Sequence, residues 1–218
     1  MMSSLTYLLI VMAAVTHLVA GVLNVSIATT WNGASVTHEP VKINLSPSFD
    51  GGLLINIQAP FFNSPPKPNG PAGQPFPGLW DYEVVEAFFL NDKDQYLEVE
   101  LCPYGQHLLL MLNGQKKMVR DKLPLTTFNA VISGNRWTGQ AILPRAYFPP
   151  GVTKFNAYAI HGAGANRVYE SLYPASNISQ PDFHRLEFFH HIDITQALNH
   201  YNPHEVSDLW LPFETIVG

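Results

Sequence analysis

Three glutamates in one predicted hairpin are the side chains whose types and spacing most suggest chemistry. Glu86 lies in an apolar run, and Glu98 and Glu100 lie in the alternating run that follows the acidic turn at 91–94. A hairpin closed by that turn places Glu86 opposite Glu100, and all three carboxylates then share one face of the sheet. Like charges directly opposite one another are unfavourable, so a cation, raised pKa values or the donors of a ligand must offset them.

The carboxylate cluster fits several kinds of chemistry, and the pattern leaves them open. Two carboxyl groups with separated pKa values act as acid and nucleophile, or as acid and base, in hydrolases. Carboxylates also accept hydrogen bonds from the hydroxyls of a small polar ligand. Together with Asp92 and Asp94 of the turn, they resemble the oxygen ligands of calcium. A further alternative is that this face is simply the solvated side of the sheet.

The elements that carry these residues are predicted to be strands. Short β-branched and aromatic runs, separated by turn residues, predict an all-β fold: a two-sheet antiparallel β-sandwich of jelly-roll type with at most one or two short helices. One such helix is expected at Ile194–Asn199, with Asp193 as its N-cap. The stretch from Pro60 to Trp80 contains seven prolines, which exclude helix and central strand. Its aromatic side chains predict an ordered loop packed over the sandwich.

Composition excludes several classes of protein. The chain has 218 residues, of which 13% are charged and 46% hydrophobic, and its net charge is −5. The chain therefore has no basic surface for nucleic acid, and its apolar content is enough for a sizeable core. Its single cysteine, Cys102, excludes an internal disulfide and a paired-cysteine metal knuckle, and is expected to stay buried as an inert thiol.

The first 21 residues are predicted to be a signal peptide. Their apolar stretch has about half the length of a membrane span and leads into small residues. Residues 22–218 would then form a single β-sandwich domain, secreted and without a membrane span. Glycosylation sequons at Asn24, Asn44 and Asn177 agree with export.

Several longer runs carry a resemblance to a known family. They are LWDYEVVEAFFLND at 79–92, QYLEVELCPYGQHL at 95–108 and YFPPGVTKFNAYAIHG at 147–162, with shorter runs TWNG, HEPV, PDFHRLE and SDLWL elsewhere. In these runs the chain resembles the uncharacterised protein family 0462, the family of the chromosome 4 open reading frame 33 protein. The resemblance covers nearly all of the chain after residue 21 and implies no activity.

More distantly, the chain resembles the family-9 carbohydrate-binding modules and the related DOMON domains, which are β-sandwiches. One strand of those modules opens with an aromatic residue, followed by an acid and then Val-Glu. In this chain Trp80, Glu83 and Glu86 resemble that pattern. In the sugar-binding members two aromatic rings sandwich the sugar and the Val-Glu carboxylate binds its hydroxyls. The resemblance assigns those roles to Trp80, Phe183 and Glu86. This chain departs from the pattern at Glu98, where the sugar binders tend to have arginine.

The expected function follows from this resemblance and from the chemistry of sugars. A pyranose has apolar C–H faces that an aromatic ring can cover, and hydroxyls that need hydrogen-bond partners. The chain is expected to be a secreted, non-catalytic module that binds a saccharide or similar small polar ligand, with Glu98, Glu100 and His161 also lining the concave face. A hydrolase that uses the three glutamates, or a structural or protein-interaction domain, is the alternative. No cofactor is expected except calcium.

Overall fold

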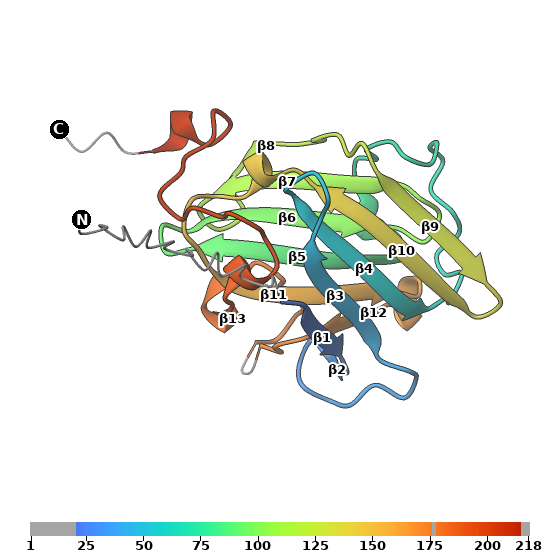
Figure 1. The fold of residues 1–218 in the computed structure, drawn as a ribbon. Coiled ribbons are helices and arrows are strands. Elements are labelled where there is room, and N and C mark those ends of the chain that lie inside the picture. Colours follow the sequence, from blue (N-terminus) through green and yellow to red (C-terminus); the bar gives the residue numbers. More distant parts are fainter. Residues whose placement is uncertain (1–20, 176–177, 215–218) are drawn as a thin grey trace, which may run out of the picture.

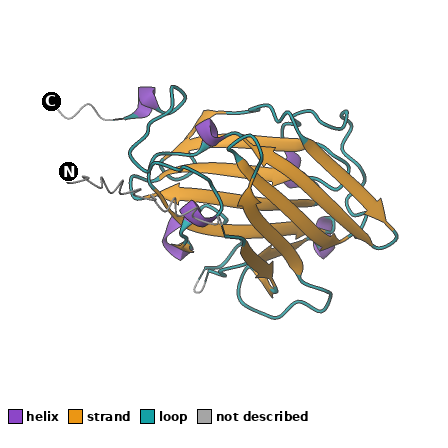
Figure 2. Cartoon of the chain, in the orientation of Figure 1, coloured by secondary structure: helices purple, strands orange, loops and turns teal. Residues whose placement is uncertain are grey.

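The chain folds as two antiparallel β-sheets packed face to face (Figures 1 and 2). The computed structural model describes residues 21–175 and 178–214. One sheet has five strands in the order β1-β3-β4-β10-β9, and the other has eight, in the order β2-β12-β11-β5-β6-β7-β8 with β13 paired to β11. The strands are β1 (Leu23–Ile27), β2 (Thr29–Thr30), β3 (Val41–Pro47), β4 (Leu53–Pro60), β5 (Val84–Asn91), β6 (Gln95–Leu101), β7 (His107–Asn113), β8 (Met118–Arg120), β9 (Phe128–Ser133), β10 (Arg136–Leu143), β11 (Val152–His161), β12 (Val168–Ser171) and β13 (His190–His191). The predicted all-β sandwich is confirmed.

Short helical turns are more numerous than the one or two predicted. The described residues form six 3-10 helices of three residues each, and they are η1 (Leu79–Asp81), η2 (Arg145–Tyr147), η3 (Gly164–Asn166), η4 (Leu186–Phe188), η5 (Ile194–Gln196) and η6 (Leu211–Phe213). Single turns of this kind are too short to show a helical period in the sequence. The helix predicted at 194–199 is η5, where the Asp193 side chain accepts from the Thr195 N–H as an N-cap. None of the described helices has the length and apolar character to cross a membrane.

The central strands of the eight-stranded sheet, β11, β5, β6 and β7, are buried on both faces. In β6, Leu97, Val99 and Leu101 point into the core between the sheets, while Tyr96 belongs to a second apolar cluster on the outer face. Strand β5 divides its side chains in the same way, because successive residues of a strand point to opposite faces. The five-stranded sheet covers only the inner face, so other parts of the chain must cover the outer one.

Two segments far apart in the sequence cover that outer face. The Pro-rich loop brings Phe76 and Leu79 against it, and the stretch after β12 brings Phe183 and Phe189. The loop is tied down by main-chain hydrogen bonds such as Phe76 N–H to His107 O, at 2.9 Å. It turns into η1 at Gly78, whose φ of 73° lies in the left-handed region that glycine adopts without strain. The turn at Gly78 directs η1, and with it Trp80, over the sheet.

Candidate functional site

A cavity of about 420 Å³ opens on the outer face of the eight-stranded sheet. Glu86 of β5 and Glu98 of β6 lie on its sheet side, and Trp80 of η1 and Phe183 contribute from the two covering segments. Four of the six ligand-binding residues predicted from the sequence therefore line one cavity. The other lining residues are Asp81, Leu110, Leu112, Lys116, Met118, Ile160, Arg167, Tyr169, Pro181, Asp182 and His184.

The carboxyl groups have the predicted register but not a solvated environment. Glu86 pairs with Glu100, and Phe88 pairs with Glu98, as the hairpin requires. Glu86, Glu98 and Glu100 are only 2%, 3% and 0% exposed, so the alternative that this is the wet side of the sheet is wrong. Both carboxyl oxygens of Glu100 and one of Glu98 have no hydrogen-bond partner among the described residues.

Burial changes the protonation of this cluster. Loss of hydration raises the pKa of Glu86 to about 8, against the smaller opposing effect of the Arg167 charge. The same loss of hydration, followed by the neighbouring carboxyl groups, raises the pKa values of Glu98 and Glu100 well above 4.5. At neutral pH Glu86 is therefore mostly protonated, and burial favours the protonated form of Glu98 and Glu100 as well. A protonated carboxyl group donates one hydrogen bond and accepts others, whereas a carboxylate only accepts.

The two aromatic residues of the cavity differ in how they are held. Trp80 is 46% exposed, so much of its indole is accessible to a ligand. Phe183 stacks face to face on Tyr158, with ring centroids 3.9 Å apart and planes 9° from parallel, and its edge meets Tyr169. Phe183 therefore offers one ring face at most, and Tyr158 fixes its orientation.

Arg167 positions the Trp80 segment, a role that the sequence did not reveal. Its guanidinium donates to the main-chain carbonyls of Trp80 and Asp81, the second at 2.7 Å, and lies 5.6 Å from the centre of the Tyr169 ring. An isolated arginine before a short strand has no distinctive sequence pattern. Only the tertiary structure, which places Arg167 beside η1, gives it this function.

Polar groups at the cavity rim were also missed. Lys116 Nζ lies 2.9 Å from a carboxylate oxygen of Asp182, and His184 Nδ1 lies 2.8 Å from the Tyr96 hydroxyl. Burial lowers the pKa of His184 to about 4, so its imidazole is neutral at pH 7. The rim thus presents an ion pair and a neutral imidazole beside the buried carboxyl groups.

The remaining predicted ligand-binding residues lie outside the cavity. Glu100 is opposite Glu86 but does not line it, and His161, at the end of β11, is hydrogen-bonded to Glu170 instead. The calcium ligands proposed at Asp92 and Asp94 lie in the β5–β6 turn, where Asp92 pairs with Lys154 Nζ at 3.1 Å. Calcium binding there stays a prediction.

Three further predictions concern Cys102 and the processed positions. Cys102 is buried, and burial raises the pKa of its thiol to about 12, which agrees with an inert side chain. The sequons at Asn24 and Asn44 lie side by side on β1 and β3, whereas Asn177 is outside the described residues. The predicted signal peptide lies almost wholly outside them as well, so export and glycosylation stay predictions.

Comparison with known proteins identifies the family. No protein-family model matches the chain. A UPF0462 protein C4orf33 homolog from Danio rerio is 54% identical over 187 residues, which cover 83% of this chain and 94% of that protein. The chain belongs to the UPF0462 family. This confirms the family resemblance seen in the sequence, and the family name states no activity.

Solved structures include two that are similar to this UPF0462 chain. A putative carbohydrate-binding protein from Bacteroides uniformis aligns with a TM-score of 0.55 and 15% identity, over 78% of this chain and 85% of that one. A family-9 carbohydrate-binding module from Caldicellulosiruptor kristjanssonii, in complex with cellotriose, aligns with a TM-score of 0.41 and 14% identity, over 68% and 73%. At such identity the first match establishes the β-sandwich fold alone.

Proposed function

We propose that this UPF0462 chain binds a saccharide or a similar small polar ligand in the outer-face cavity. The observation that carries the proposal is the half-exposed Trp80 ring beside the buried carboxyl groups of Glu86 and Glu98 in one cavity of about 420 Å³. A cavity of this size falls within the range of about 300–1,000 Å³ typical of small-molecule sites. The similar structure from Bacteroides uniformis is that of a putative carbohydrate-binding protein, which supports the same ligand class.

The chemistry of the cavity suits a sugar. The indole of Trp80 can cover the apolar C–H face of a pyranose. A sugar hydroxyl both donates and accepts hydrogen bonds, and so does a protonated Glu86 or Glu98. An unpaired buried polar group costs about 1–3 kcal/mol, so a bound hydroxyl that satisfies the free Glu98 oxygen contributes directly to affinity.

The carboxyl groups favour binding over hydrolysis. A glycosidase uses one protonated acid and one ionised nucleophile or base, whose environments move their pKa values apart. Here burial raises the pKa values of Glu86, Glu98 and Glu100 together. We therefore propose a non-catalytic module.

We further propose that the chain acts outside the cell. The supporting features are the apolar segment at 1–21 and the sequons, of which Asn24 and Asn44 lie on the outer face of the five-stranded sheet. Expression in animal cells should release into the medium a protein that lacks about 21 residues. Recovery of the protein only from the cytosol, with Met1 intact, would contradict export.

A glycan array followed by calorimetry with the best glycan tests the ligand proposal. Trp80→Ala should weaken binding at least about tenfold, since it removes the accessible ring, and should leave the urea midpoint nearly unchanged. The matched control is Phe49→Ala, which removes a ring that is 93% exposed in the β3–β4 turn. Phe49→Ala should bind as the wild type does. Equal affinity in both variants, or no glycan bound by the wild type, would refute the proposal.

A further inference from the structure

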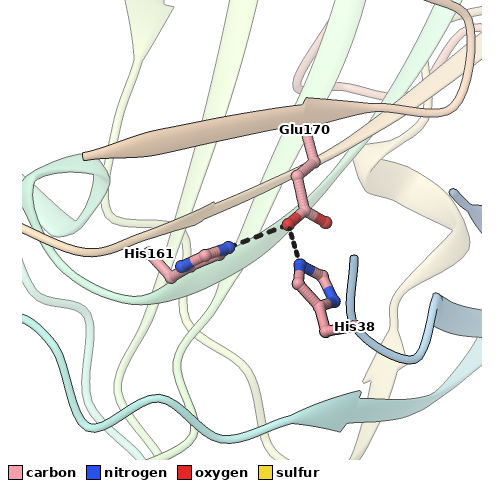
Figure 3. A group of neighbouring side chains, drawn as sticks. All are labelled: His38, His161 and Glu170. Atoms are coloured by element: carbon pink, nitrogen blue, oxygen red, sulfur yellow. Dashed lines mark hydrogen bonds and ion pairs between the residues drawn. The ribbon is translucent and has the colours of Figure 1, made fainter. Parts of the chain in front are cut away.

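Two histidines and a glutamate converge on one point away from the cavity (Figure 3). His38 Nε2 and His161 Nε2 each lie 2.8 Å from the same oxygen, Oε1 of Glu170. The three residues come from the loop before β3, the end of β11 and the middle of β12. All three ligand atoms lie within 4.8 Å of one another.

The hydrogen bonding of His38 leaves its Nε2 unprotonated in the neutral ring. His38 Nδ1 lies 3.0 Å from the main-chain oxygen of Glu39, and a carbonyl can only accept, so Nδ1 carries the proton. The lone pair of Nε2 then points at a carboxylate oxygen, which is also an acceptor. Two hydrogen-bond acceptors 2.8 Å apart repel each other unless a positive charge lies between them. A metal ion would supply it, and the contact from Nδ1 to a carbonyl is the arrangement that orients metal-binding histidines.

The carboxyl group of Glu170 is likewise incompletely satisfied. Glu170 is 0% exposed, and its second oxygen, Oε2, has no hydrogen-bond partner in the described part of the chain. Phe62 stacks on the His161 ring at 3.6 Å and 7°, which holds that imidazole in place. The site is therefore rigid at His161 and Glu170, while His38, with a side chain 22% exposed, lies on the solvent side.

We propose that His38, His161 and Glu170 bind a divalent transition-metal ion of the zinc class. Two imidazoles and one carboxylate favour such an ion over calcium, which takes oxygen ligands. Zinc bonds of about 2.0–2.2 Å in tetrahedral geometry separate the ligand atoms by roughly 3.3 Å. Each imidazole nitrogen would then lie about half an ångström farther from Oε1 than its present 2.8 Å, and the two nitrogens, now within 4.8 Å of each other, would approach to the same spacing. Three protein ligands leave a fourth position for water or another group.

This metal site is independent of the saccharide cavity. Glu170 pairs with Ala159 and faces the inner side of the eight-stranded sheet, whereas its neighbour Tyr169 pairs with Ile160 and lines the cavity on the outer side. The ion would join the loop that carries His38 to two strands near the sheet edge. Its binding should therefore stabilise the folded chain by mass action.

Zinc titration of the chelator-treated full chain, against a chromophoric competitor, tests the site. We expect one Zn²⁺ per chain and a rise in melting temperature that excess chelator reverses, and excess Ca²⁺ should not displace the bound Zn²⁺. Glu170→Gln and His38→Ala should each weaken zinc binding at least about tenfold. The matched control is His204→Ala, because His204 is exposed and far along the chain from the three ligands. That variant should bind zinc as the wild type does.

Two readouts separate loss of a ligand from loss of the fold. Glu170 is fully buried, so its variant must be shown by circular dichroism to be folded, whereas the partly exposed His38 can be truncated with little disturbance. Bound Co²⁺ should give the intense visible absorption of a four-coordinate site in the wild type and lose it in His38→Ala. A wild type that binds no stoichiometric zinc would overturn the proposal and indicate a shared proton instead. Equal zinc affinity in His38→Ala and His204→Ala would overturn it too.

Discussion

Replacing Glu100 by glutamine should change how stability depends on pH. Burial, and then the nearby Glu86 and Glu98, raises the pKa of Glu100 well above 4.5. The folded chain therefore keeps a proton that the unfolded chain releases above about pH 4.5, and the wild type loses stability as pH rises from there toward the folded pKa. Glutamine has no proton to release, so Glu100→Gln should gain stability relative to the wild type over the same window.

The size of the effect follows from the linkage between protons and folding. One pKa unit corresponds to about 1.4 kcal/mol, so the difference between Glu100→Gln and wild type should grow by up to about 3 kcal/mol between pH 5 and pH 7. Glu100 does not line the cavity and neither of its oxygens has a partner in the described structure, so the variant breaks no hydrogen bond. The assay is urea unfolding at pH 5, 6, 7 and 8, with free energies of unfolding from linear extrapolation.

An exposed carboxylate provides the matched control. Glu187 accepts from Arg185 Nε at 2.7 Å, and this hydrogen bond lowers its pKa. The stability that this hydrogen bond contributes is complete above about pH 4.5 and is lost only at lower pH. The difference in free energy of unfolding between Glu187→Gln and the wild type should therefore be constant from pH 5 to pH 8. The reasoning would be refuted if the difference in free energy of unfolding between Glu100→Gln and the wild type stays constant, or falls, as pH rises. Such a result would mean that Glu100 is ionised in the folded chain, as a bound cation requires.

Two further predictions concern the cavity and the processed surface. Arg167→Met removes the donors that hold the Trp80 carbonyl, so calorimetry should find saccharide binding weakened about tenfold. The control Arg120→Met changes an exposed arginine and should leave the affinity unchanged. Equal affinities in the two variants would contradict the positioning role of Arg167. Asn24 and Asn44 are register partners, and Asn44 Nδ2 donates to Asn24 Oδ1 at 2.9 Å, so a glycan on one should hinder the other. Mass spectrometry of secreted protein should find at most one glycan at this pair, and double occupancy would contradict the expected crowding.

Local features of the sequence were sufficient to predict the β5–β6 hairpin. The alternation of apolar and polar residues from Gln95 to Cys102 assigns each side chain to a face, and the acidic turn sets which residues pair. The pairing of Glu86 with Glu100 follows from these two facts, and the structure has it. The N-cap at Asp193 is local in the same sense, since its bond reaches only two residues along the chain.

Burial of the carboxyl face was decided by tertiary structure. The alternation in β6 fits a solvated outer face equally well, and only the packing of the Pro-rich loop and the segment around Phe183 removes it from water. The protonation of Glu86 and the shape of the cavity depend on that cover, because desolvation is the main cause of the raised pKa. No periodicity within a strand contains this information.

The three proposed metal ligands were even harder to predict from the sequence than the burial of the carboxyl face. His38, His161 and Glu170 have no ligand spacing in the sequence, and His161 was expected on the concave face with the glutamates. The sequence alone determined only that these residues are available. The pairing of β12 with β11 at the sheet edge, and the return of the His38 loop over it, brought the three together. Contacts between distant segments depend on how sheets and loops pack as a whole, and local residue preferences do not encode them.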